Sequence, residues 1–152
     1  MTVDLGTLID AAASHALATG LFERVNMHEP KSAPGYGLTA AVWVQSVTPI
    51  QGSGLDSASA RVELSVRIFT KMLSEPQDMI DPHMIAAVNT LINSYVGDFD
   101  LGVTGVRHVD VLGAAGLPLA AQAGYVNQDG TLYRVMTISL PIVVNDVWAE
   151  AV

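Results

Sequence analysis

Residues 60–68 read ARVELSVRI, and this stretch decides the fold because apolar and polar side chains alternate along it. Its apolar members are Ala60, Val62, Leu64, Val66 and Ile68. Successive side chains of a β-strand point to opposite faces of the sheet, so this period of two predicts a strand with one apolar and one charged face. The charged face must meet water or another polar surface.

The residues before this strand predict a hairpin. Residues 36–45 alternate in the same way and predict a second strand. Between the two strands, residues 48–59 read TPIQGSGLDSAS, and such small and polar side chains are typical of a long, mobile loop. Residues 25–37 are rich in proline and glycine and predict another loop.

Two helices flank this pair of strands. Asp4 is the predicted cap of the first helix, and Gly20 is its predicted stop. The second begins at Asp81-Pro82, because aspartate caps helices and proline fits the first helical position, and it ends at Gly97. Their apolar faces consist of Leu5, Leu8, Ile9, Ala12 and Ala16, and of Met84, Ile85, Val88, Leu91, Ile92 and Tyr95.

Three further strands are predicted in the C-terminal third, over residues 103–112, 119–126 and 131–144. A flexible stretch, GAAGLP at residues 113–118, separates the first two, and Asp129-Gly130 is a strong turn signal before the third. Pro141 cannot donate a ladder hydrogen bond, so we expect the end of the last strand to lie at a sheet edge.

The order of these elements, helix, two strands, helix and three strands, predicts the α+β class. We expect one domain over residues 1–152, with a mostly antiparallel sheet of about five strands and two helices packed on one face. Half of the 152 residues are hydrophobic and only 14% are charged, whereas typical soluble domains carry about 25% charged residues. Left-over apolar surface indicates an oligomer, although a well-filled core with an alanine-rich helix explains the same composition.

Composition also disfavours several classes of protein. The chain has no run of about 20 apolar residues, so we expect no membrane span, and Met1 to Asp10 lacks the basic segment of a secretory signal. Without cysteine, disulfides and cysteine-bound metals are excluded. The net charge is −8 and the basic residues are scattered, whereas nucleic-acid binding needs clustered Lys and Arg.

The best local candidate for catalysis is His108 with Asp110. Two residues apart in a strand, they share a face, as a metal pair or an acid–base dyad requires. We interpret them as a solvated polar strand face, because no further ligand is identifiable nearby, and we interpret Asp98 and Asp100 as a solvated turn. The sequence therefore predicts no enzyme, no metal and no cofactor.

A protein-binding role is predicted instead. The candidate interface residues are Trp43, Arg61, Glu63, Arg67, Gly54, Leu55 and Asp56. Trp43 lies opposite the aliphatic face of its strand, and tryptophan is enriched at binding hot spots. The stripe of Arg61, Glu63 and Arg67 is typical of a solvated face. If a subunit packs there, its alternating signs allow salt bridges between subunits, which favour register over affinity.

The layout resembles the tail terminator family of siphophages. The segments that carry the resemblance are Phe22-Glu23-Arg24-Val25, Ala40-Ala41-Val42-Trp43-Val44, Gly54-Leu55-Asp56-Ser57, Arg61-Val62-Glu63-Leu64-Ser65-Val66 and Thr137-Ile138-Ser139-Leu140. With the opening helix, the middle helix and the C-terminal hairpin, they span nearly the whole chain. The C-terminal third is longer than in compact members of that family.

The resemblance implies a virion protein that forms a homohexameric ring on the head-proximal end of the tail tube. Such a ring stops tube polymerisation and offers a surface to the head–tail connector, and it is assembled in the host cytoplasm. The tail tube protein and the connector proteins are then the partners, and DNA passes through the lumen without specific binding. An acidic lumen fits the net charge of −8, because it repels DNA.

Three other interpretations remain open from the sequence. The first is another structural phage protein, either a tail-tube subunit or a head–tail joining protein. The second is a small enzyme that uses His108 and Asp110, and the third is an α+β domain that binds a small ligand. Tube subunits stack indefinitely, whereas a terminator stops at one ring, and no residue pattern separates these two.

Overall fold

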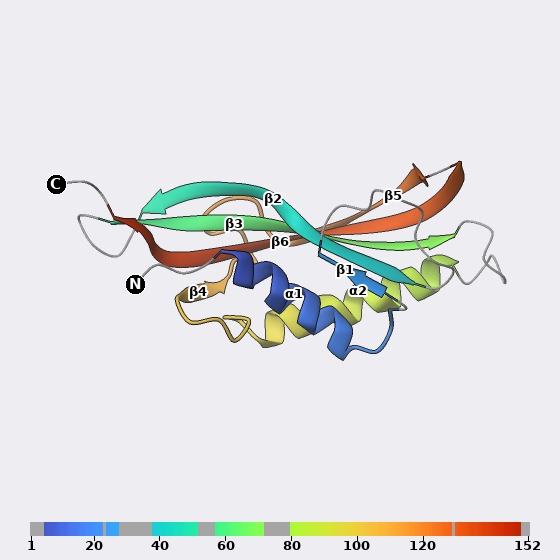
Figure 1. Cartoon of the computed structure of the whole chain (residues 1–152), viewed down its shortest axis with the longest axis horizontal. Coiled ribbons are helices and arrows are strands. Elements are labelled where there is room, and N and C mark those ends of the chain that lie inside the picture. The colour runs from blue at the N-terminus through green and yellow to red at the C-terminus, as the bar shows by residue number, and fades with distance from the viewer. Residues whose placement is uncertain are drawn as a thin grey trace.

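A long sheet with both helices on one of its faces forms the described part of the chain (Figure 1). The computed structural model describes residues 5–22, 24–27, 38–51, 57–71, 80–128 and 130–149. The elements are α1 (Gly6–Ala18), β1 (Arg24–Asn26), β2 (Thr39–Gln51), β3 (Ser57–Lys71), α2 (Ile80–Gly97), β4 (Val106–Val109), β5 (Ala120–Gln128) and β6 (Thr131–Ala149).

The sheet has the strand order β1-β2-β3-β6-β4, and β5 pairs with β6 beyond the end of β4. The β1–β2 pair is parallel and the other pairs are antiparallel. This architecture confirms the predicted α+β class, with two helices on one face of a mostly antiparallel sheet. The described residues contain six strands, one more than expected. The additional strand is β1, which occupies the start of the predicted loop and is too short to show a period of two.

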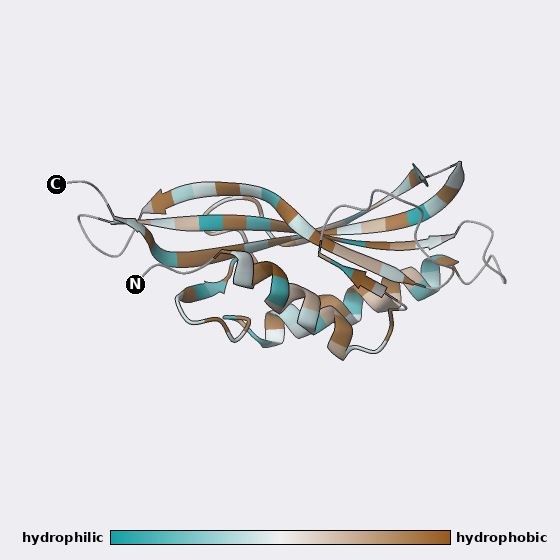
Figure 2. Ribbon diagram, in the orientation of Figure 1, coloured by the Kyte–Doolittle hydropathy of each residue, from teal (hydrophilic) through white to brown (hydrophobic). Residues whose placement is uncertain are grey.

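The helix-covered face of the sheet holds the main core. The alternating apolar residues of β3 are buried there, and the same face of β6 contributes Ile138, Leu140 and Ile142. Figure 2 shows the alternation of apolar and polar residues along the long strands. The hydroxyl of Tyr95 on α2 donates a hydrogen bond of 2.9 Å to the carbonyl of Ala12 and so joins the two helices. Burial raises the pKa of Tyr95, which keeps this donor protonated.

Both helices end as predicted, at Gly20 and Gly97, but they start differently, and the N-cap position of α1 is Leu5. Gly20 follows α1 with φ of +70°, the left-handed conformation in which glycine ends helices. The predicted cap, Asp4, lies outside the described residues. The second helix includes Ile80, two residues before the predicted first position Pro82, so Asp81 lies within its first turn and is not the predicted cap. There the carboxylate of Asp81 accepts a hydrogen bond of 3.0 Å from Arg134 Nε on β6 and connects helix to sheet.

The hairpin of β2 and β3 is longer than predicted. Residues 48–51 and 57–59, which were expected in a mobile loop, are paired strand, with Thr48 opposite Arg61 and Ile50 opposite Ser59. Backbone pairing continues here without an apolar pattern, because ladder hydrogen bonds do not depend on side-chain character. The remainder of that loop lies outside the described residues. In contrast, β4 is much shorter than the predicted strand over residues 103–112.

Pro141 does not lie at a sheet edge, so that prediction is wrong. Its strand is central, paired with β3 on one side and with β4 and β5 on the other. The Pro141 carbonyl accepts a hydrogen bond of 2.9 Å from the Asp110 amide. In an extended strand, the amide and carbonyl of one residue point to the same side. The amide hydrogen that Pro141 lacks would therefore also point toward this side of β6, at the gap between the end of β5 and the start of β4. Proline is tolerated because the ladder is interrupted at that place.

Candidate interaction surface

The sheet face away from the helices, called the outer face below, carries every second residue of β3. From one end to the other these are Ser59, Arg61, Glu63, Ser65, Arg67 and Phe69. The outer face has three parts: a loop fixed over Arg61, a polar groove around Ser65, and a small apolar cluster around Phe69. No described helix covers it (Figure 1).

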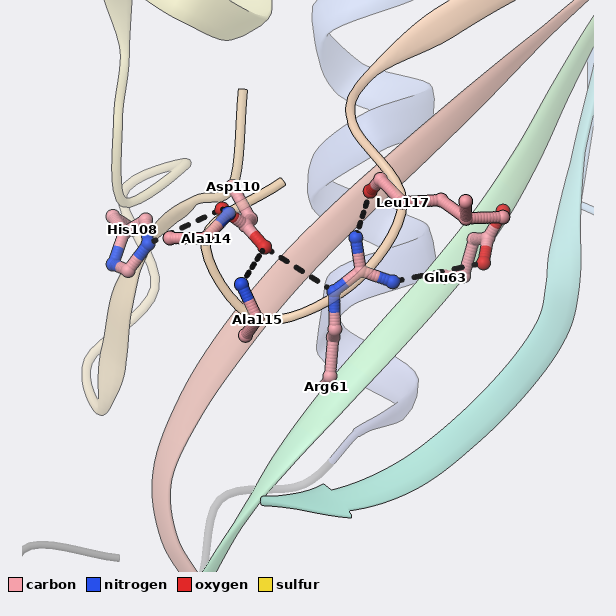
Figure 3. Close-up of polar contacts among 7 residues, drawn as sticks. All are labelled: Arg61, Glu63, His108, Asp110, Ala114, Ala115 and Leu117. Atoms are coloured by element: carbon pink, nitrogen blue, oxygen red, sulfur yellow. Dashed lines mark hydrogen bonds and ion pairs between the residues drawn. The ribbon is translucent and has the colours of Figure 1, made fainter. Parts of the chain in front are cut away.

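The first part is the segment 110–118 between β4 and β5, called the braced loop below. Arg61 holds it to the sheet (Figure 3). Its Nε donates to Asp110 Oδ2 at 3.3 Å, and its Nη2 donates to the carbonyl of Leu117. Its Nη1 also lies 3.8 Å from Glu63 Oε2. One guanidinium thus connects the start of the loop, its end and the neighbouring residue of its own strand face.

Asp110 is the acceptor around which the braced loop turns. Only 2% of the residue is exposed. Its Oδ1 accepts a hydrogen bond of 2.8 Å from the Ala114 amide, and its Oδ2 accepts one of 3.0 Å from the Ala115 amide (Figure 3). Burial acts to raise the pKa of this carboxyl, but the two amides and Arg61 together hold the pKa below its usual range. The carboxylate is therefore charged at neutral pH.

Two glycines allow the braced loop to lie this close to Arg61. A Cβ on Gly116 would lie 2.7 Å from Arg61 Cζ, a distance that real Cβ atoms do not adopt. Gly113 has φ of +77°, and a Cβ there would lie 2.6 Å from the Gly116 carbonyl oxygen. The stretch predicted as a flexible linker is thus a compact turn whose glycines are required by close packing.

The braced loop presents two leucines to solvent. Leu112 is 90% exposed and Leu117 is 72% exposed, the two largest values among the large apolar residues of the described chain. Arg61 holds the Leu117 backbone by a hydrogen bond to its carbonyl, while the Leu117 side chain lies largely in solvent. Exposed apolar side chains on a fixed support are typical of a surface that another molecule covers.

A polar groove of about 420 Å³ forms the second part of the outer face. Arg67 and Thr137 both line it, and Arg67 Nε donates a hydrogen bond of 2.9 Å to Thr137 Oγ1. The Arg67 guanidinium also lies over the Trp43 ring, 5.2 Å from its centre. Beyond the groove, Phe69 and Tyr133 pack edge to face at 6.4 Å in the third part, the apolar cluster.

The predicted interface residues are distributed unevenly over this surface. Trp43, Glu63 and Arg67 lie on the outer face with Arg61, as the period of two requires. The expectation that the charged stripe is solvated is wrong for Arg61, which is only 7% exposed because the braced loop covers it. Gly54, Leu55 and Asp56 lie outside the described residues. Sequence reasoning missed Leu112 and Leu117, although Leu112 directly precedes the glycine-rich stretch and Leu117 lies within it.

The catalytic alternative receives little support from the geometry. His108 Nε2 lies 3.9 Å from Asp110 Oδ1, so the two residues do approach each other. Yet Asp110 is buried, and its oxygens already accept hydrogen bonds from the braced loop and Arg61. The interpretation as a solvated strand face was therefore wrong for Asp110, which instead supports the loop. Among the described residues, no group of three His, Asp or Glu side chains is placed to hold a metal ion.

The other acidic pair lies in the turn after α2. Asp98 accepts a hydrogen bond of 3.0 Å from His15 Nε2, if that nitrogen is protonated, and Asp100 accepts one of 2.9 Å from the Gly102 amide. Both carboxylates thus have structural partners. No helix within the described residues combines the length and apolar character that crossing a membrane requires.

Several solved structures match this chain, two of them as follows. A chain of the virion of a native gene transfer agent particle shares 15% identity with this chain over 93% of this chain and 95% of that one, with a TM-score of 0.49. A chain in the sheath/tube terminator of an extracellular contractile injection system shares 12% identity over 100% of this chain and 61% of that one, with a TM-score of 0.41. Both TM-scores lie below 0.5, so neither likeness carries an argument about function. No family model and no curated protein matches the chain.

Proposed function

We propose that this protein is a structural virion protein, a tail terminator that closes the head-proximal end of a phage tail tube. The observation that carries the proposal is the braced loop, in which a buried Arg61–Asp110 pair fixes a turn that presents Leu112 and Leu117 to solvent. The resemblance of the sequence to siphophage tail terminators supports the same role. On this proposal the chain acts as one domain, and it is part of the tail after assembly in the host cytoplasm.

A terminator needs three kinds of contact, and the proposal assigns them to different surfaces. Each subunit contacts its two neighbours in a homohexameric ring, which closes because every contact is used within the ring. The braced loop is proposed to contact the tail tube protein or the connector, which meet the ring on its two sides. Trp43, Glu63 and Arg67 of the outer face remain proposed contact residues, together with Gly54, Leu55 and Asp56.

Electrostatics supports passage of DNA through such a ring. The chain carries a net charge of −8, and hydrogen bonds to other groups of the protein engage four of its arginines, Arg61, Arg67, Arg107 and Arg134. Phosphate binding requires free, clustered cations that release counterions. DNA is therefore proposed to pass the lumen without specific binding.

We also propose that the protein is not an enzyme, because the Asp110 carboxylate is already occupied by hydrogen bonds within the protein. A general base needs a lone pair directed at substrate, whereas the oxygens of this carboxylate accept hydrogen bonds from the protein itself. The group fits a structural support, since its partners hold the loop together.

The first experiment measures the mass of the purified protein by light scattering on a sizing column, followed by negative-stain imaging. A closed ring of six subunits that caps one end of added tail tubes is the expected result. Open filaments of the pure protein contradict the terminator and support a tube subunit. A protein that neither forms a ring nor binds tubes contradicts both.

A further inference from the structure

Besides the short edges of β1 and β4, two longer strand edges of the sheet have no strand partner among the described residues. One is the outer edge of β5, which pairs only with β6. The other is the edge of β2 from Val42 to Gln51, because β1 covers only residues 39–41 of that strand. Each of these edges offers a row of backbone donors and acceptors that another strand can complete.

The β5 edge carries none of the features by which monomeric proteins prevent such pairing, and the β2 edge carries only two of them. Those features are charged side chains, prolines, bulges and short length. The sequence of β5, AAQAGYVNQ, has no charge and no proline, and it pairs with β6 without a register shift. The free part of β2, VWVQSVTPIQ, is also uncharged. It contains one proline and one bulge, between Val44 and Ser46.

The two edges also match in the character of their faces. On the helix side, β2 presents Val44 and Val47, and both side chains are exposed. The same side of β5 presents Ala121, Ala123 and the exposed Tyr125. On the outer side, the exposed residues next to these edges include Thr48 and Gln122. Joining the edges therefore places apolar residues beside apolar ones and polar residues beside polar ones.

Strand directions favour the same pairing. The ladders β2–β3, β3–β6 and β6–β5 are all antiparallel, so β5 runs opposite to β2. A second copy placed beyond β5 in the same orientation therefore offers its β2 antiparallel to β5. The free parts lie at opposite ends of the sheet, because β5 is aligned with residues 131–139 of β6 and free β2 is aligned with its later half. Neighbouring copies are thus staggered, as closure of a sheet requires.

We infer that the partner of the β5 edge is the β2 edge of a second copy of this chain. The contact is heterologous, since one copy uses β5 and its neighbour uses β2, and repetition closes a ring or extends a filament. The inference rests on the proposed function, in which copies of this chain associate into a ring, and it names the strand edges through which they do so. It also leaves the braced loop free for a different protein.

The absence of native cysteine permits a direct test by crosslinking. Gln122→Cys on β5 and Thr48→Cys on β2 are prepared as separate proteins, mixed and treated with a short bis-maleimide. The expected product is a covalent dimer in the mixture and none in either variant alone. A variant with both substitutions should give a ladder that ends at the mass of the full assembly. Asn93→Cys on the exposed side of α2, mixed with Gln122→Cys, is the matched control and should not crosslink.

A second variant pair keeps the test independent of the crosslinker. Val47→Lys adds a charge to the β2 edge, whereas Ile85→Lys adds it to another exposed apolar position, on α2. Val47→Lys should weaken self-association at least about tenfold, and Ile85→Lys should leave it unchanged.

Three outcomes overturn the edge pairing. They are crosslinking of Gln122→Cys with itself, absence of crosslinks in a sample that light scattering shows to be oligomeric, and a protein that stays monomeric at every concentration. In the last two cases the terminator proposal survives if the protein still caps added tail tubes. Correct edge crosslinks in open filaments support the pairing and contradict the terminator.

Discussion

The two faces of the sheet are held by different forces. On the helix side, fully buried aliphatic residues such as Leu64 and Leu140 pack beneath α1 and α2, and burial of apolar area supplies the stability. On the outer face, the Arg61–Asp110 pair and its three hydrogen bonds to the braced loop hold that loop in place, while its leucines stay in solvent. Burial of an ion pair contributes little net stability, but it specifies one position. The helix side thus supplies most of the stability of the fold, and the outer face fixes the position of the loop that carries the exposed leucines.

The largest effect is expected for Leu140→Ala on the helix side. Leu140 is fully buried, and the truncation removes packed atoms and leaves a cavity. The free energy of unfolding, measured by urea titration, should fall by about 2–5 kcal/mol. Leu132→Ala on the same strand is the control, because Leu132 is 47% exposed. Equal losses in both variants would show that burial beneath the helices is not the source of the stability that Leu140 contributes.

The next effect is expected for Asp110→Ala on the outer face. The substitution leaves the Arg61 guanidinium and the Ala114 and Ala115 amides without their acceptor. The unfolding free energy should fall by about 1.5–3 kcal/mol, less than for a core residue because the loop can lift and admit water. Hydrogen exchange should increase at residues 113–118 before it does in β3. Asp100→Ala, which removes a single exposed acceptor, should cost much less.

A change of pH is expected to have a smaller effect on the free energy of unfolding, through the Asp110 carboxyl. Because the folded-state pKa of Asp110 lies below its usual value, its contribution is fully present above the unfolded value of about 3.9 and is lost as pH falls through the folded value. Urea titrations of the native chain and of Asp110→Asn should therefore differ by a constant amount above about pH 5. The difference should narrow below about pH 4. A difference that stays constant down to pH 2 would contradict the lowered pKa of this carboxyl in the folded protein.

The smallest effect on folding is expected for the pair Leu112→Ser with Leu117→Ser. Both side chains are exposed, so the unfolding free energy should change by about 0.5 kcal/mol or less. Binding to tail tubes or connector, measured by co-sedimentation, should nevertheless be lost if the braced loop is the contact. Leu132→Ser is the matched control and should bind normally. Loss of stability together with binding would make the leucines part of the fold instead.

The sequence alone predicted those features that neighbouring residues encode. The period of two in residues 60–68 specified a strand and its two faces, and the apolar spacing of residues 80–97 specified the second helix. Such patterns are local because they follow from the repeat of one strand or one helix. The α+β class then followed from the order of elements, since amphipathic strands and helices must cover one another.

Tertiary structure alone decided the features that join distant residues. Arg61 looked like one member of a solvated stripe until Asp110, far along the chain, placed the braced loop over it. Likewise, Pro141 looked like an edge residue until β4 and β5 met at the same side of β6. Periodicity shows which face a side chain occupies, but it does not show what covers that face. Which strand or loop lies there depends on the packing of the whole chain, and that packing placed Leu112 and Leu117 in solvent.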